Sequence, residues 1–152
     1  MSGAPANVHG TAIVVGTTGL IFLGPSGSGK SILAFDCLCE ARSAGQFAAL
    51  VSDDRVLISR YGDCVVATRP NQIKDLIELR HAGIGRFRSI PRTVLSYAVL
   101  PINRETADRL PPENARVALC RDTTLPAIHL PTDVRLPFAF INALIGAEVP
   151  LI

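Results

Sequence analysis

The sequence contains no tryptophan and a single methionine, and aromatic residues make up only 5% of it. Lysine is also scarce, because Lys30 and Lys74 are the only two in the chain. Nearly all of the positive charge is therefore arginine, which suits fixed contacts with phosphate and carboxylate groups better than general solubility. The formal net charge of +2 is too small to indicate a nucleic-acid partner.

Long apolar runs and paired cysteines are missing as well. No uninterrupted apolar segment is long enough to cross a bilayer, and no basic stretch precedes an apolar one at the start, so we expect neither a membrane partner nor a signal peptide. The four cysteines form no C-x-x-C pair, which argues against zinc and favours reduced thiols in a cytoplasmic protein. The length fits one domain, residues 1–152. With 48% hydrophobic residues, part of its surface is expected to lie between subunits.

The most informative feature present is a complete phosphate-binding loop of the pattern G-x-x-x-x-G-K-S. Its glycines let backbone N–H groups turn toward phosphate oxygens, and the following helix directs its partial positive charge at the same place. In this motif the lysine reaches the β and γ phosphates, and the final hydroxyl holds Mg²⁺. The sequence therefore predicts an ATP and Mg²⁺ site at Gly24-Pro25-Ser26-Gly27-Ser28-Gly29-Lys30-Ser31.

The residues on both sides of this loop have the pattern of a strand and a helix. Residues 20–23 are a short apolar run, typical of a buried parallel strand, and apolar residues recur at helical spacing from position 32 until Gly45. We therefore predict an α/β fold with a P-loop and a mixed sheet flanked by helices. Further strands are expected at 11–15, 47–51, 56–58, 64–67, 94–100, 117–119 and 127–130, a short helix within 71–79, a loop over 104–114 and a terminal helix over 138–145.

Two adjacent carboxylates, Asp53 and Asp54, follow the buried strand expected at 47–51. In a P-loop fold this is where Mg²⁺ or its water is held and where a catalytic base can stand. One carboxylate could remain ionised beside the metal while the other accepts a proton from an attacking hydroxyl. A simple Asx turn between strands is the alternative, but the P-loop favours a functional pair. Which aspartate would be the base is left open.

In their order along the chain, these motifs resemble the catalytic domain of HPr kinase/phosphorylase. That bacterial enzyme phosphorylates a serine of HPr, the phosphocarrier protein of the phosphotransferase system. The resemblance implies a fold similar to that of phosphoenolpyruvate carboxykinase, a cytoplasmic location, HPr as the partner and assembly into a homo-oligomer, a hexamer. The protein-kinase signatures H-R-D and D-F-G are absent, in agreement with that fold. The segments that carry the resemblance are Val8-His9-Gly10, the P-loop and residues 51–56, 77–84, 108–110 and 125–134.

The resemblance also implies roles for individual residues. His9 matches a family active-site histidine, and one aspartate of the pair deprotonates the substrate serine. Glu78 matches a second Mg²⁺ ligand, and Arg80 belongs to a loop important for catalysis. Arg109 matches a catalytic arginine on a mobile loop, where it would neutralise charge on the transferred phosphoryl group.

The chain also departs from the family pattern. His9 lies almost at the start, so the usual N-terminal domain is not expected, as in the short form found in some proteobacteria. Ile32 replaces a usual glutamate, and Ala127 replaces a lysine in a late loop tied to phosphorolysis, so the kinase direction is better supported than the phosphorylase direction. Two alternatives stay open: a P-loop kinase for a small metabolite, and a non-catalytic module that senses ATP and signals through its apolar surface.

Overall fold

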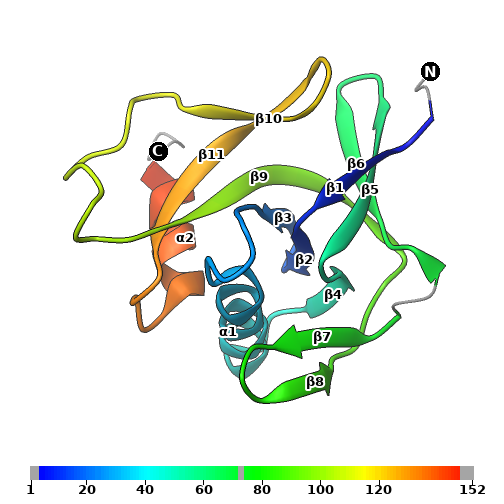
Figure 1. The fold of residues 1–152 in the computed structure, drawn as a ribbon, viewed down its shortest axis with the longest axis horizontal. Helices are drawn as coiled ribbons and strands as arrows, with labels where there is room; N and C mark the ends of the chain where they lie inside the picture. Colours follow the sequence, from blue (N-terminus) through cyan, green and yellow to red (C-terminus); the bar gives the residue numbers. More distant parts are fainter. Residues whose placement is uncertain (1–3, 72–73, 148–152) are drawn as a thin grey trace.

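A computed structural model describes residues 4–71 and 74–147 of the chain (Figure 1). Within these residues, nine strands form one mixed sheet in the order β1-β5-β6-β9-β3-β2-β4, and β11 extends it by pairing with β9 and β10. β9 is long enough to pair with β6, β3 and β11 along its length. The strands are β1 (Ala6–His9), β2 (Thr11–Val15), β3 (Thr18–Phe22), β4 (Ala48–Ser52), β5 (Arg55–Tyr61), β6 (Cys64–Thr68), β9 (Arg92–Ile102), β10 (Arg116–Cys120) and β11 (Thr123–Pro131).

Two helices and a hairpin pack on the sheet. In Figure 1, helix α1 (Lys30–Ser43) lies between helix α2 (Pro137–Ala147) and the hairpin of β7 (Leu76–Leu79) and β8 (Gly83–Arg86). The Glu40 carboxylate of α1 accepts hydrogen bonds of 2.9 Å from the main-chain N–H groups of Phe138 and Ala139. These N–H groups have no partner inside their own helix, so Glu40 caps α2 and joins the two helices. Neither helix in the described part of the chain has the length and apolar character needed to span a membrane.

The central strands are buried on both faces of the sheet. Alternate residues of β2, β3 and β4 point to opposite sides, because side chains alternate along a strand. On one side they pack against α1, and on the other they pack against residues of β5, β6 and β9. This double burial explains why β3 reads as a continuous apolar run. The largest side chains with almost no exposure are Phe22, Ile13, Leu20, Ile21, Leu33, Leu38, Leu50, Ile77, Leu130 and Ile141.

Most of the secondary structure expected from the sequence is confirmed, including the mixed α/β class and the terminal helix. β3 pairs in parallel with β9, as expected for a strand before a P-loop, and antiparallel with β2. A short helix was expected within 71–79: Asn71 is in a 3₁₀ conformation, residues 72–73 lie outside the described residues, and Leu76–Leu79 at the end of the range is strand β7. Pairing with β8 and burial of Ile77 against α1 override the local pattern there.

Candidate active site

The P-loop connects the end of β3 to the start of α1. Gly27 and Gly29 have φ angles of +83° and +99°, a left-handed conformation that residues with a side chain rarely adopt. Gly29 is the residue before the helix, and the first turn of α1 contains no acidic residue. The partial positive charge at this helix end is therefore unopposed by its own side chains and directed at the loop.

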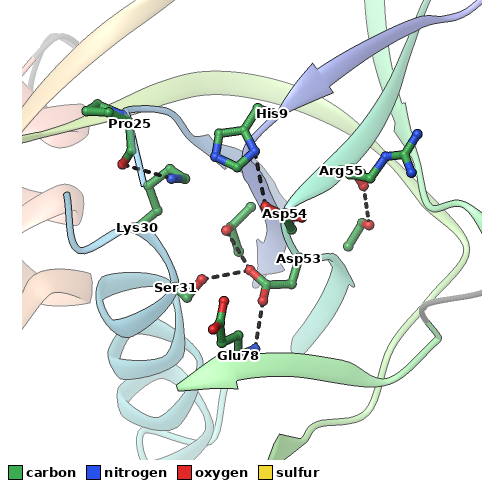
Figure 2. Close-up of polar contacts among 10 residues, drawn as sticks. His9, Pro25, Lys30, Ser31, Asp53, Asp54, Arg55 and Glu78 are labelled. Carbon is green, nitrogen blue, oxygen red and sulfur yellow. Dashed lines mark hydrogen bonds and ion pairs between the residues drawn. The ribbon is translucent and has the colours of Figure 1, made fainter. Parts of the chain in front are cut away.

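Lys30 is the first residue of α1, and its ammonium group turns back over the loop. Its Nζ donates a hydrogen bond of 3.1 Å to the carbonyl oxygen of Pro25 (Figure 2), and the residue is only 7% exposed. Burial lowers the pKa of Lys30, and the nearby carboxylates of Asp54 and Asp53 oppose this effect. A buried cation held over the P-loop is well placed to meet an anionic ligand.

Asp53 is buried and accepts three hydrogen bonds. The hydroxyls of Thr11 and Ser31 each donate to its Oδ1 at 2.8 Å, and the main-chain N–H of Glu78 donates to its Oδ2 at 2.7 Å (Figure 2). The donors come from β2, α1 and β7, so three separate elements hold this carboxylate. The structure thereby joins the last residue of the P-loop to the first aspartate of the predicted pair.

Asp54 faces the other way. Its φ of +72° is uncommon for a residue with a side chain but tolerated by aspartate, and it separates the directions of the two neighbouring carboxylates. The Asp54 side chain is 65% exposed, and its Oδ1 lies 3.1 Å from Nδ1 of His9 (Figure 2). The N–H of Gly10 donates to the main-chain oxygen of Asp54 at 3.1 Å. One aspartate is therefore engaged inside the protein, and the other is presented to solvent beside a histidine.

The β7–β8 hairpin brings two more predicted residues to the loop. The side chain of Glu78 is exposed, and Figure 2 shows its carboxylate turned toward Ser31. The guanidinium of Arg80 lies against the P-loop, since a Cβ added to Gly27 would be 3.5 Å from Nη1 of Arg80. The hairpin therefore adds one carboxylate and one cation to the site.

Arg109 lies elsewhere in this structure. It belongs to the segment between β9 and β10, which lines a cavity of about 960 Å³ together with β11 and α2, beside Phe140 and Leu144. Among the described residues, no hydrogen bond or ion pair joins Arg109 to the P-loop. Of the residues predicted from the sequence, the structure brings together His9, the P-loop, both aspartates, Glu78 and Arg80, but not Arg109.

Thr11 is the site residue that the sequence analysis missed. It follows the singled-out His9 and Gly10, but a threonine at the start of a buried strand carries no chemical signal of its own.

A second unpredicted feature is the hydroxyl of Ser28, which is buried and without a hydrogen-bond partner in the described chain. An unpaired buried hydroxyl is costly unless a ligand or water meets it, so a polar ligand at the loop fits this atom.

The donor set suits a nucleotide with Mg²⁺. Ser31, Asp53 and Glu78 offer oxygen atoms, the ligand type that Mg²⁺ prefers. Within the described residues, no group of three or more histidine, cysteine or acidic side chains is arranged to hold a metal by itself. Mg²⁺ usually binds through one or two protein oxygens together with substrate phosphates and waters, so the arrangement fits this ion.

Comparison with known proteins gives matches of three kinds. The family model described as HPr Serine kinase C-terminal domain matches residues 3–90, which include every predicted site residue except Arg109. A curated protein named HPr kinase/phosphorylase, from Mycoplasmopsis pulmonis (strain UAB CTIP), is 38% identical over 77 residues, or 51% of this chain and 23% of that protein. A solved structure entitled "Structure of the Hpr(Ser) kinase/phosphatase from Coxiella burnetii" superposes with a TM-score of 0.72 over 94% of this chain and 95% of that one, at 17% identity. The last match shows a shared fold.

Proposed function

The chain belongs to the HPr serine kinase C-terminal domain family, and on this basis we propose that it is an ATP-dependent kinase for a serine of an HPr-type phosphocarrier protein. The observation that carries the proposal is the pair of aspartates with opposite orientations beside the P-loop. Asp53 contacts the hydroxyl of Ser31, and Asp54 is exposed beside His9. Phosphoryl transfer to a hydroxyl needs one group near the metal and one facing the acceptor.

The P-loop residues are proposed to bind ATP. The main-chain amides of the loop and the ammonium of Lys30 would hold the phosphates, with Lys30 exchanging the Pro25 carbonyl for phosphate oxygens. Ser31, Asp53 and Glu78 would hold Mg²⁺, directly or through water. When bound, that ion supplies charge neutralisation on the phosphate oxygens.

Asp54 is proposed as the general base. Both oxygens of Asp53 already accept hydrogen bonds inside the protein, whereas Asp54 is exposed and contacts only His9 through its side chain among the described residues. The serine oxygen of the acceptor forms a bond to the γ-phosphorus while the bond to the bridging oxygen of ADP breaks. Asp54 takes the proton that the serine hydroxyl loses, and His9 orients the Asp54 carboxylate.

Arg80 is the better placed of the two predicted arginines to neutralise charge during transfer. We expect Arg80→Ala to lower the transfer rate about 10²-fold, because its guanidinium lies against the loop that holds the phosphates. Arg109→Ala is the matched comparison. The family resemblance predicts a comparable loss for Arg109, while its place in a cavity that no P-loop residue lines predicts a smaller one. Initial rates of phosphorylation for the two variants measure the difference, and a larger loss for Arg109→Ala would contradict the assignment to Arg80.

The acceptor is tested with labelled ATP and HPr purified from the same organism. Label on a serine of HPr is the expected result, and label on a histidine or no label would contradict the proposal. Phosphorylation of a small metabolite in a parallel screen would instead favour a P-loop metabolite kinase. ATP binding without turnover in the presence of HPr would favour a sensing module. Adding inorganic phosphate to the phosphorylated product tests whether phosphorolysis also occurs.

We also propose that the protein is cytoplasmic and works as a homo-oligomer, a hexamer by analogy with its family. Several large apolar side chains near the C-terminal helix are exposed, which supports burial between subunits: Leu110, Leu136, Phe140 and Leu144. Sedimentation analysis of the purified protein measures its oligomeric state.

A further inference from the structure

Thr11 is a fully buried threonine whose hydroxyl contacts the candidate metal site. It is 0% exposed, and its Oγ1 donates a hydrogen bond of 2.8 Å to Oδ1 of Asp53. Ser31 donates to the same oxygen at the same distance. A buried hydroxyl with a single proton, directed at a functional carboxylate, does more than fill space.

The strand order explains why a residue is needed at this position. β2 lies between β3, which leads into the P-loop, and β4, which leads to Asp53. Neighbouring strands are about 4.8 Å apart, so the strand before the loop and the strand before Asp53 are about 10 Å apart. A side chain from β2 fills this interval, because Oγ1 of Thr11 lies within hydrogen-bond distance of Oδ1 of Asp53.

The hydrogen-bond geometry indicates what Thr11 does for its neighbours. A serine hydroxyl has one proton, and the Ser31 hydroxyl uses its proton to donate a hydrogen bond to Asp53. The lone pairs of Ser31 Oγ are therefore available to a cation. This arrangement holds only while the Asp53 carboxylate keeps its orientation. Thr11 donates a hydrogen bond to Oδ1 of Asp53 and the N–H of Glu78 donates one to Oδ2, so each carboxylate oxygen is held in place.

Gly10 supports this contact from the preceding position. Its N–H donates to the main-chain oxygen of Asp54, and a Cβ at Gly10 would lie 2.9 Å from the carbonyl oxygen of Phe22. The segment is therefore packed too closely against β3 for a side chain at that position. Three consecutive residues, His9, Gly10 and Thr11, thus contact the two aspartates.

We propose that Thr11 is a positioning residue for the metal–nucleotide site. Its hydroxyl holds the Asp53 carboxylate so that the proton of Ser31 is turned away from the cation. The inference rests on the proposed function, because it takes the P-loop and Asp53 as the Mg²⁺·ATP site. Residues that orient metal ligands typically change metal affinity 10–100-fold when they are replaced.

The test compares Thr11→Val, which keeps the shape and removes the hydroxyl, with Thr11→Ser, which keeps the hydroxyl. Binding of a non-hydrolysable ATP analogue is measured by calorimetry without acceptor, over a range of Mg²⁺ concentrations. We expect Thr11→Val to raise the half-saturating Mg²⁺ concentration about tenfold, to leave binding of the metal-free analogue unchanged, and Thr11→Ser to restore the wild-type value. Thr123→Val is the matched control, because Thr123 is a buried threonine on β11, away from the P-loop.

An unchanged Mg²⁺ dependence in folded Thr11→Val would overturn the inference. Thermal unfolding shows whether that variant is folded, and Thr11→Ala compared with Thr11→Ser gives the same test if it is not. Because no acceptor is present, the result is independent of the proposed substrate. Failure of the wild-type protein to phosphorylate HPr would overturn the proposed function and leave the role of Thr11 intact.

Discussion

Asp54→Asn is expected to reduce the rate of phosphoryl transfer about 10²–10⁴-fold, the usual contribution of a general base. Asparagine has the same shape and tolerates the φ of +72° found at this position, so the fold should be retained. The amide cannot accept the serine proton. Because the Asp54 side chain is exposed and makes no contact with the P-loop hydroxyls, the affinity for ATP should change little. Single-turnover rates at saturating Mg²⁺ and ATP measure the effect.

Asp53→Asn is the matched comparison one residue away. Its side chain accepts hydrogen bonds from Thr11 and Ser31, and an amide in that place lowers the charge beside the metal. We therefore expect Asp53→Asn to raise the Mg²⁺ requirement, an effect that Asp54→Asn should not show. If Asp54→Asn retains full activity and Asp53→Asn alone abolishes transfer at saturating Mg²⁺, the assignment of the base to Asp54 is wrong.

Lys30→Ala should reduce ATP-dependent phosphorylation about 10²–10³-fold, a range typical for removal of one preorganised electrostatic contact. Lys30 is buried over the loop, and no second lysine can take its place because Lys74 is the only other one. The lost cation would leave the phosphate charge less neutralised during transfer. The affinity for ATP, measured by calorimetry, should also fall.

Lys74→Ala is the control that the composition of the chain provides. Lys74 is exposed and lies before β7, so its loss removes an equal charge without removing a phosphate contact. Activity close to that of the wild type is expected for this variant. Intact phosphorylation by Lys30→Ala would show that the P-loop is not the site of transfer.

Much of the fold could be predicted because its signals are local. The strand before the P-loop is apolar at successive positions because both of its faces are buried, and helix α1 begins at Lys30, directly after the loop. Strand β7 was not predicted, because pairing with β8, which lies further along the chain, determines its conformation. The sequence could not tell which of Arg80 and Arg109 lies nearer the P-loop, because their positions depend on how the β7–β8 hairpin and the segment after β9 pack.

The sequence by itself predicted the class of ligand. The eight residues of the P-loop are contiguous, so their backbone geometry and the helix that follows are set by local chemistry. Only the tertiary structure decided which way the side chains of Asp53 and Asp54 face. Their orientations depend on the φ of Asp54 and on hydrogen-bond donors from β2, α1 and β7, which are distant in the chain and meet only in the folded protein.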